Sequence, residues 1–196
     1  MGRWEPGAGG RLREAALALF VERGFEQTMV ADIAARAGVT ARTFFRHYAD
    51  KREVLFDGAA ELQERVLAAL AAVPPGTGAL DAVAAALDVV AELLGDDREF
   101  ARRRQAVIMA DTELRERELA KFAALSAALA DALRQRGTDA LEAGIAAETG
   151  VAVHRVAYER WLAAGDGADG AVDGDDADLR DVIRTALTRL RALTAA

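Results

Sequence analysis

The segment from Val30 to Lys51 constrains the fold more than any other part of the chain, because two short amphipathic patterns there flank one glycine. Gly38 stands between them, where a tight turn favours a residue that tolerates positive φ. This arrangement predicts a helix-turn-helix, the unit whose second helix enters a DNA major groove. The apolar residues expected to face each other are Ile33, Ala34 and Ala37 in the first helix and Val39, Phe44 and Tyr48 in the second.

The outer side of the second helix separates a DNA-binding helix pair from a purely structural one. A structural pair could share the apolar pattern, but it would not need a polar outer face. Here that face carries Arg42, Thr43, Arg46 and His47. These residue types contact phosphates and base edges in DNA complexes, so the sequence predicts DNA binding.

Composition predicts an all-α protein, since the chain has three prolines, long Ala/Leu/Arg/Glu runs and no stretch of alternating β-branched residues. We expect a three-helix DNA-binding domain at residues 1–52, with 1–9 as a flexible arm, and a larger ligand-binding and dimerisation domain at 53–196. The aspartate-rich segment 165–178 lacks the spacing of a calcium loop and is expected to be a solvated loop. The expected helices, about nine in number, are 11–23, 30–37, 41–47, 51–72, 78–94, 97–110, 113–136, 139–164 and 178–194.

Charge is divided unevenly along the chain. Residues 1–52 carry nine Arg/Lys and six Asp/Glu, a balance of +3, whereas the remainder carries 16 and 26, a balance of −10, which together give the net −7. The positive balance lies where the helix-turn-helix lies, as DNA binding requires.

Several short elements stand in register between Arg11 and Phe56. They are an apolar first helix ending at Gly24-Phe25, Asp32-Ile33-Ala34, Ala37-Gly38-Val39, and Lys51 at the next helix start. On these elements the segment resembles the DNA-binding domain of TetR-family transcriptional repressors. The resemblance implies a repressor that binds a palindromic operator as a homodimer, with an activator and a helix-turn-helix used for protein interaction as open alternatives.

The candidate DNA-contacting residues are predicted partly from the helix pattern and partly from this resemblance. Thr40 is expected to cap the recognition helix, and Arg42 is expected to read guanine, or else to touch only phosphate. Phe45 stands where the family has a tyrosine whose hydroxyl binds phosphate. Thr28 is expected to cap the second helix and Lys51 to begin the fourth. Both positions resemble those that contact phosphate in the family. The full candidate set is Thr28, Thr40, Ala41, Arg42, Thr43, Phe45, Arg46, His47 and Lys51.

The last two predicted helices each carry an apolar stripe suited to a two-fold dimer interface. Paired with the same two helices of a second copy, they would form a four-helix bundle, which is the arrangement found in the family. The alternative is that the stripes pack only within one chain. The stripes are Leu141, Ile145, Ala152 and Val156 in 139–164, and Leu179, Val182, Ala186, Leu190 and Leu193 in 178–194.

The stretch RRRQAVIMADTELRERELAKFAALSAALADAL and the later RVAYERWL resemble the C-terminal domain of the mycofactocin-regulator type. This resemblance implies a small hydrophobic or acyl-CoA-like effector. The alternative is that the apolar side chains are simple core and the arginines a solvated face. The candidate ligand-binding residues are Phe100, Arg103, Val107, Ile108, Phe122, Leu125, Leu129, His154, Tyr158 and Trp161.

Other function classes find little support in the sequence. With no cysteine, two distant histidines and no nucleophile, phosphate-loop or zinc-helix motif, we expect no enzyme, no cofactor and no metal site. We also expect a soluble, cytoplasmic protein, since neither a signal peptide nor a transmembrane stretch is evident.

Overall fold

A computed structural model describes residues 7–95, 97–164 and 178–195. Most of the predicted arm and nearly all of the aspartate-rich loop lie outside these residues. The chain forms two compact units: the first comprises 1–59 and 102–118, and the second 60–101 and 119–196. This grouping differs from the predicted division at residue 52, because residues 102–118 pack with the N-terminal segment.

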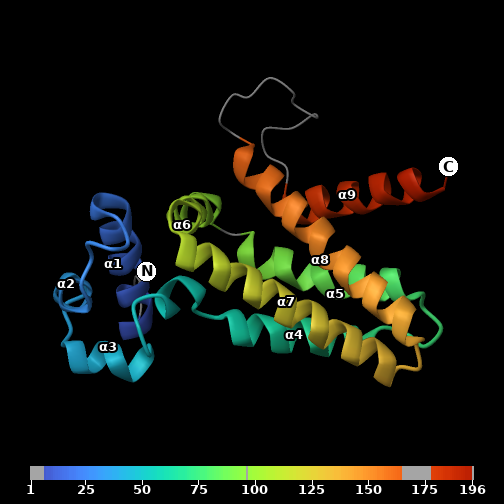
Figure 1. Cartoon of the computed structure of the whole chain (residues 1–196), viewed down its shortest axis with the longest axis horizontal. Coiled ribbons are helices and arrows are strands. Elements are labelled where there is room, and N and C mark those ends of the chain that lie inside the picture. Colours follow the sequence, from blue (N-terminus) through green and yellow to red (C-terminus); the bar gives the residue numbers. More distant parts are fainter. Residues whose placement is uncertain (1–6, 96, 165–177, 196) are drawn as a thin grey trace, which may run out of the picture. The chain divides into compact units, whose positions relative to one another are not determined.

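The first unit begins with three helices, α1 (Ala8–Arg23), α2 (Val30–Arg36) and α3 (Ala41–His47), followed by the 3-10 turn η1 (Glu53–Phe56). Helix α1 contacts α2 and η1, and α2 contacts α3 (Figure 1). Of the six side chains expected at the junction of α2 and α3, Val39 is half-buried. The other five are buried, as predicted: Ile33, Ala34, Ala37, Phe44 and Tyr48.

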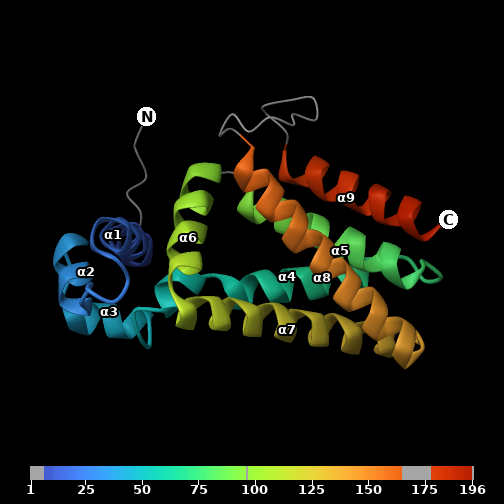
Figure 2. The ribbon, with the colours of Figure 1, turned by 45° about the horizontal axis from the view of Figure 1, so that its top comes forward.

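The second unit contains α4 (Ala59–Ala72), α5 (Ala79–Leu94), α8 (Ala140–Ala163) and α9 (Leu179–Thr194). Helices α6 (Arg98–Ala110) and α7 (Thr112–Gln135) have residues in both units. Within the second unit, α5 contacts α8 and α9, and α8 also contacts α9 (Figure 2).

Helices α5 and α8 approach closely at Gly150. A Cβ atom placed there would lie 2.3 Å from Cγ1 of Val83 and 3.4 Å from Cδ1 of Leu87. Valine is stiff at χ1 and cannot move aside easily. The absence of a side chain at Gly150 therefore sets the distance between these two helices.

The all-helical prediction is confirmed for the described residues, which contain α1 to α9 and no strand. The predicted start of the fourth helix at residue 51 is wrong, because η1 intervenes and α4 begins at Ala59. Two local features explain the break. The Asp50 carboxylate accepts hydrogen bonds from the backbone N–H groups of Arg52 (2.8 Å) and Glu53 (3.2 Å), and Gly58 has a φ of 79°.

Candidate DNA-binding and ligand-binding sites

The turn between α2 and α3 is built as the sequence predicts. Gly38 has a φ of 68°, and the N–H of Val39 donates to the Ala34 carbonyl at 2.9 Å, which closes the end of α2. Thr40 is the N-cap of α3, and its Oγ1 accepts a hydrogen bond from the Thr43 N–H at 3.1 Å. The start and direction of α3 are thus fixed by local bonds.

The two sides of α3 differ sharply in exposure. Phe44 is fully buried, and its ring centroid lies 5.5 Å from that of Tyr48. Phe45, the next residue, is 58% exposed. The exposed residues of α3 are Ala41, Arg42, Phe45, Arg46 and His47, with Thr43 half-buried.

Tyr48 anchors the end of α3 to more distant parts of the first unit. Its hydroxyl donates to Oδ2 of Asp57 at 2.9 Å and lies 3.3 Å from the Gly9 carbonyl. Burial and the adjacent Asp57 carboxylate raise the pKa of Tyr48 well above its usual value. The phenol therefore stays protonated and keeps this anchor at any pH near neutrality.

The prediction that Thr28 caps the second helix is wrong. The N-cap of α2 is Met29, whose N–H donates to Oδ2 of Asp32 at 3.4 Å. Thr28 is 1% exposed, and its Oγ1 lies 2.8 Å from the Gly24 carbonyl and 3.3 Å from that of Leu19. The hydroxyl therefore holds the turn between α1 and α2 rather than facing outward.

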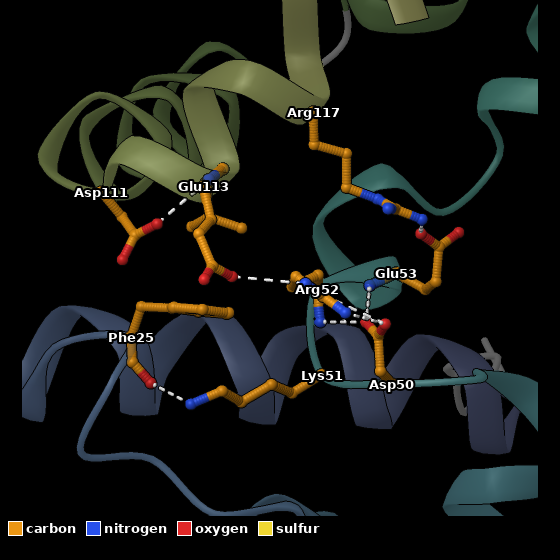
Figure 3. A network of polar contacts seen from close by, with 9 residues as sticks. Phe25, Asp50, Lys51, Arg52, Glu53, Asp111, Glu113 and Arg117 are labelled. Atoms are coloured by element: carbon orange, nitrogen blue, oxygen red, sulfur yellow. Dashed lines mark hydrogen bonds and ion pairs between the residues drawn. The ribbon is translucent and has the colours of Figure 1, made fainter. Parts of the chain in front are cut away.

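Lys51 also points into this turn. Its ammonium Nζ donates to the carbonyl oxygens of Phe25 at 2.8 Å, Glu26 at 3.2 Å and Thr28 at 3.2 Å. It also lies 4.3 Å from the centroid of the Phe25 ring. The sequence prediction placed this ammonium on DNA phosphate, whereas the structure gives it internal partners (Figure 3).

Ion pairs join the chain that leaves α3 to the start of α7 (Figure 3). Arg52 binds Oδ2 of Asp50 at 2.8 Å and Oε2 of Glu113 at 3.3 Å. The Arg52 guanidinium lowers the pKa of the Asp50 carboxyl. Arg117 in α7 forms a further ion pair with Glu53 in η1.

Arg104 in α6 fastens the same region from another side. Its Nε donates to the Leu55 carbonyl at 2.6 Å, and its guanidinium lies 5.3 Å from the Phe56 ring centroid. It also pairs with Glu118 of α7 at 3.3 Å. The contacts of Arg104 with Leu55 and Phe56, together with the ion pairs of Arg52 and Arg117, explain why residues 102–118 pack with the N-terminal segment.

Residues 12–57 match the family model of bacterial regulatory proteins of the tetR family. TcmR of Streptomyces glaucescens, an HTH-type transcriptional regulator, is 41% identical over 80 residues, which cover 41% of this chain and 35% of TcmR. MftR of Mycobacterium tuberculosis, a proposed transcriptional regulator of mycofactocin biosynthesis, is 28% identical over 77% of this chain and 78% of its own length.

Likeness to solved structures extends over nearly the whole chain. FadR of Thermus thermophilus, a TetR-family transcriptional repressor crystallised with lauroyl-CoA, is 26% identical with a TM-score of 0.54, covering 93% of each chain. Residues 12–57 thus form a domain of the tetR family. The TetR-family resemblance in the sequence is confirmed, and the match with MftR extends it into the second unit.

The candidate ligand-binding residues are distributed over both units. Arg103, Val107 and Ile108 belong to the first unit, and the other seven belong to the second. Leu125 and Leu129 are buried in the core between α4, α5, α7 and α8, against which Phe122 packs.

A row of three rings follows one face of α8. The ring centroid of Tyr158 lies 6.0 Å from that of His154 and 5.7 Å from that of Trp161, and all three side chains are buried. The Arg98 guanidinium lies over the Trp161 ring at 5.0 Å. Nδ1 of His154 is buried and has no hydrogen-bond partner among the described residues. Burial lowers the pKa of His154 to about 4, so the imidazole is neutral at pH 7.

The predicted dimer stripe of α8 is exposed in the single chain. Leu141, Ile145 and Val156 are 72%, 59% and 58% exposed, and Ala152 is exposed as well. The stripe of α9 is mixed, since Leu179 is buried in the core of its own chain. The remaining α9 positions are half-buried at Val182, Ala186 and Leu190, and exposed at Leu193.

Two further features bear on function. Among the described residues, no group of three or more His, Cys, Asp or Glu side chains is placed to hold a metal ion. Within the same residues, no helix is long and apolar enough to cross a membrane.

Proposed function

We propose that this TetR-family regulator is a repressor that binds a palindromic operator as a homodimer and is released by an acyl-CoA-like ligand. The observation that carries the DNA-binding part is the outer face of α3, where Arg42, Arg46 and His47 are exposed above a buried Phe44. Arg42 lies in the first turn, where its guanidinium can reach guanine O6 and N7.

Division of labour along α3 follows from residue chemistry. Arg42 and Thr43 read base edges, while Arg46 and His47 bind phosphates, and the capped N-terminus adds backbone N–H groups near the phosphates. Phe45 has no hydroxyl to offer a phosphate, so its exposed ring contacts deoxyribose or a thymine methyl group. The positive balance of residues 1–52 supports the same assignment.

The dimer part rests on the exposed apolar stripe of α8. A stripe of Leu141, Ile145, Ala152 and Val156 is costly to leave in water, and a two-fold partner would cover it with the same stripe. The half-exposed side of α9 adds Val182, Ala186 and Leu190. Two DNA-binding domains held in this way can read two half-sites of one operator.

The ligand part rests on the second unit. FadR of Thermus thermophilus binds lauroyl-CoA, and this chain shares its fold. His154 supplies a buried nitrogen beside the Tyr158 and Trp161 rings that has no hydrogen-bond partner in the described part of the chain. A polar atom among aromatic rings suits a ligand with a long apolar part and a few polar groups. Ligand and operator then oppose each other through one coupling free energy.

Selection of bound duplexes from a random pool tests the proposal. We expect enrichment of a two-fold symmetric motif with half-site centres about 10 base pairs apart or a multiple of that. Lauroyl-CoA and acyl-CoAs of other chain lengths, added to the selected complex, should lower the apparent operator affinity. A tightly bound acyl-CoA that leaves operator affinity unchanged would contradict release by this class of ligand. Enrichment of an asymmetric motif would contradict operator binding as a homodimer.

An activator remains the second candidate for the sign of regulation, because the sign depends on where the operator lies relative to a promoter. The salt dependence of binding distinguishes DNA binding from protein interaction through the helix-turn-helix. Operator binding should weaken steeply as salt rises, since counterions are released from phosphates, whereas a protein partner would not require the duplex at all.

A further inference from the structure

The surroundings of Lys51 differ from those of a lysine whose ammonium is available to bind a DNA phosphate. A lysine ammonium has three N–H donors, and Nζ of Lys51 has three carbonyl acceptors, at 2.8, 3.2 and 3.2 Å. All its donors are therefore engaged inside the protein. A phosphate oxygen could bind this ammonium only by displacing one of these carbonyls.

An aromatic ring completes the site around the ammonium. The Phe25 ring centroid lies 4.3 Å from Nζ, which is within the range of a favourable cation–π contact. Phe25 is itself 6% exposed and packs against Phe20 with ring centroids 5.2 Å apart. The ring that faces the ammonium is thus fixed by the core beneath it.

The bonds of Lys51 join the two ends of the helix-turn-helix. Phe25, Glu26 and Thr28 precede α2, whereas Lys51 follows α3. The hydroxyl of Thr28 ties the same turn to the end of α1 through the Gly24 carbonyl at 2.8 Å. One ammonium thereby holds the chain entering α2 to the chain leaving α3.

We propose that Lys51 is a positioning residue for DNA binding, which pins the two ends of the helix-turn-helix together, and that it is not a phosphate ligand. The effect of Lys51 on operator affinity rests on the proposed DNA-binding function. Lys51 acts through α2 and α3, whose relative position presents Arg42, Arg46 and His47 to the duplex.

The variant Lys51→Met keeps the apolar stem over Phe25 and removes the ammonium. We expect operator binding about threefold to tenfold weaker, and a Tm lower by about 5 °C, because three charge-assisted bonds are lost. The slope of log K against log salt should stay at the wild-type value. Lys51→Arg, which restores a cation with N–H donors, should recover part of both the affinity and the Tm.

The matched control is Arg46→Met, which removes one exposed charge from α3. It should lower the salt slope by about 0.9 for each head and leave the Tm unchanged. If Lys51→Met lowers the slope by the same amount as Arg46→Met, Lys51 binds phosphate and the proposal is overturned. It is also overturned if Lys51→Met matches wild type in both affinity and Tm.

Amine labelling of the wild-type protein gives a test that does not depend on a folded variant. Lys51 and Lys121 are the two lysines of the chain, so an acylating reagent followed by mass spectrometry reports them separately. We expect Lys51 to react much more slowly in the free folded protein than in the denatured chain, with no further change on adding operator. Labelling at the denatured-chain rate, followed by protection on DNA, would overturn the proposal. If no duplex is bound at all, the proposed function fails while Tm and labelling still decide the role of Lys51.

Discussion

Replacement of Phe44 by alanine is expected to destabilise the DNA-binding head by about 3–5 kcal/mol, the usual cost of deleting a fully buried phenylalanine side chain. Phe44 has no exposed surface and lies between the rings of Phe45 and Tyr48, with centroid separations of 5.5 Å in each case. Its loss leaves a cavity at the junction of α2 and α3. Thermal unfolding followed by circular dichroism should show the loss of stability, and operator binding should disappear at temperatures where wild type still binds.

Phe45→Ala is the matched control, because it deletes the same side chain from the neighbouring position. Phe45 is 58% exposed, so stability should change by no more than about 0.5 kcal/mol. Operator affinity should nevertheless fall, since the exposed ring is assigned to the DNA surface. Equal destabilisation by the two variants would contradict the orientation of α3 described above.

Acidification is expected to destabilise the second unit through His154. Burial lowers the pKa of this imidazole from 6.5 to about 4. The unfolded chain therefore binds a proton between these two pH values that the folded chain does not bind. Stability contributed by neutral His154 is complete above pH 6.5 and is lost as pH falls toward 4, by about 3 kcal/mol in total.

Denaturant unfolding of wild type and His154→Phe at several pH values between 4 and 7 isolates this effect, because the carboxylates titrate in both proteins. The difference in unfolding free energy should shift in favour of the variant as pH falls. His47→Phe is the control, because it removes the other histidine of the chain, which is exposed on α3. Parallel curves for wild type and His154→Phe would contradict burial of a neutral imidazole.

Local patterns were sufficient to predict the helix-turn-helix. The glycine at the turn, the threonine cap and the alternation of apolar and polar positions each act within a few residues. Gly38 adopts positive φ, Thr40 caps α3, and Phe44 is buried, all as the sequence predicted. The TetR-family resemblance pointed the same way because it rests on the same short elements.

Roles that depend on distant parts of the chain could not be read in this way. Lys51 finds its partners 23 to 26 residues earlier, and Arg52 reaches Glu113, 61 residues later. Thr28 looked like a cap because it stands two residues before α2, but the folding back of its turn buries it. The division of the candidate ligand residues between two units depends on the same long-range contacts around Arg104.

The most direct test of sequence reading by α3 is a comparison of base preferences between wild type and Arg42→Ala. Operator duplexes carrying each single base-pair change are titrated with both proteins at one salt concentration. We predict that Arg42→Ala loses discrimination of about 1–3 kcal/mol at one base pair in each half-site, as expected when a bidentate guanine contact is removed. Preferences elsewhere should be retained. A uniform loss of affinity on every duplex, with all base preferences intact, would contradict the account, because Arg42 would then bind only phosphate.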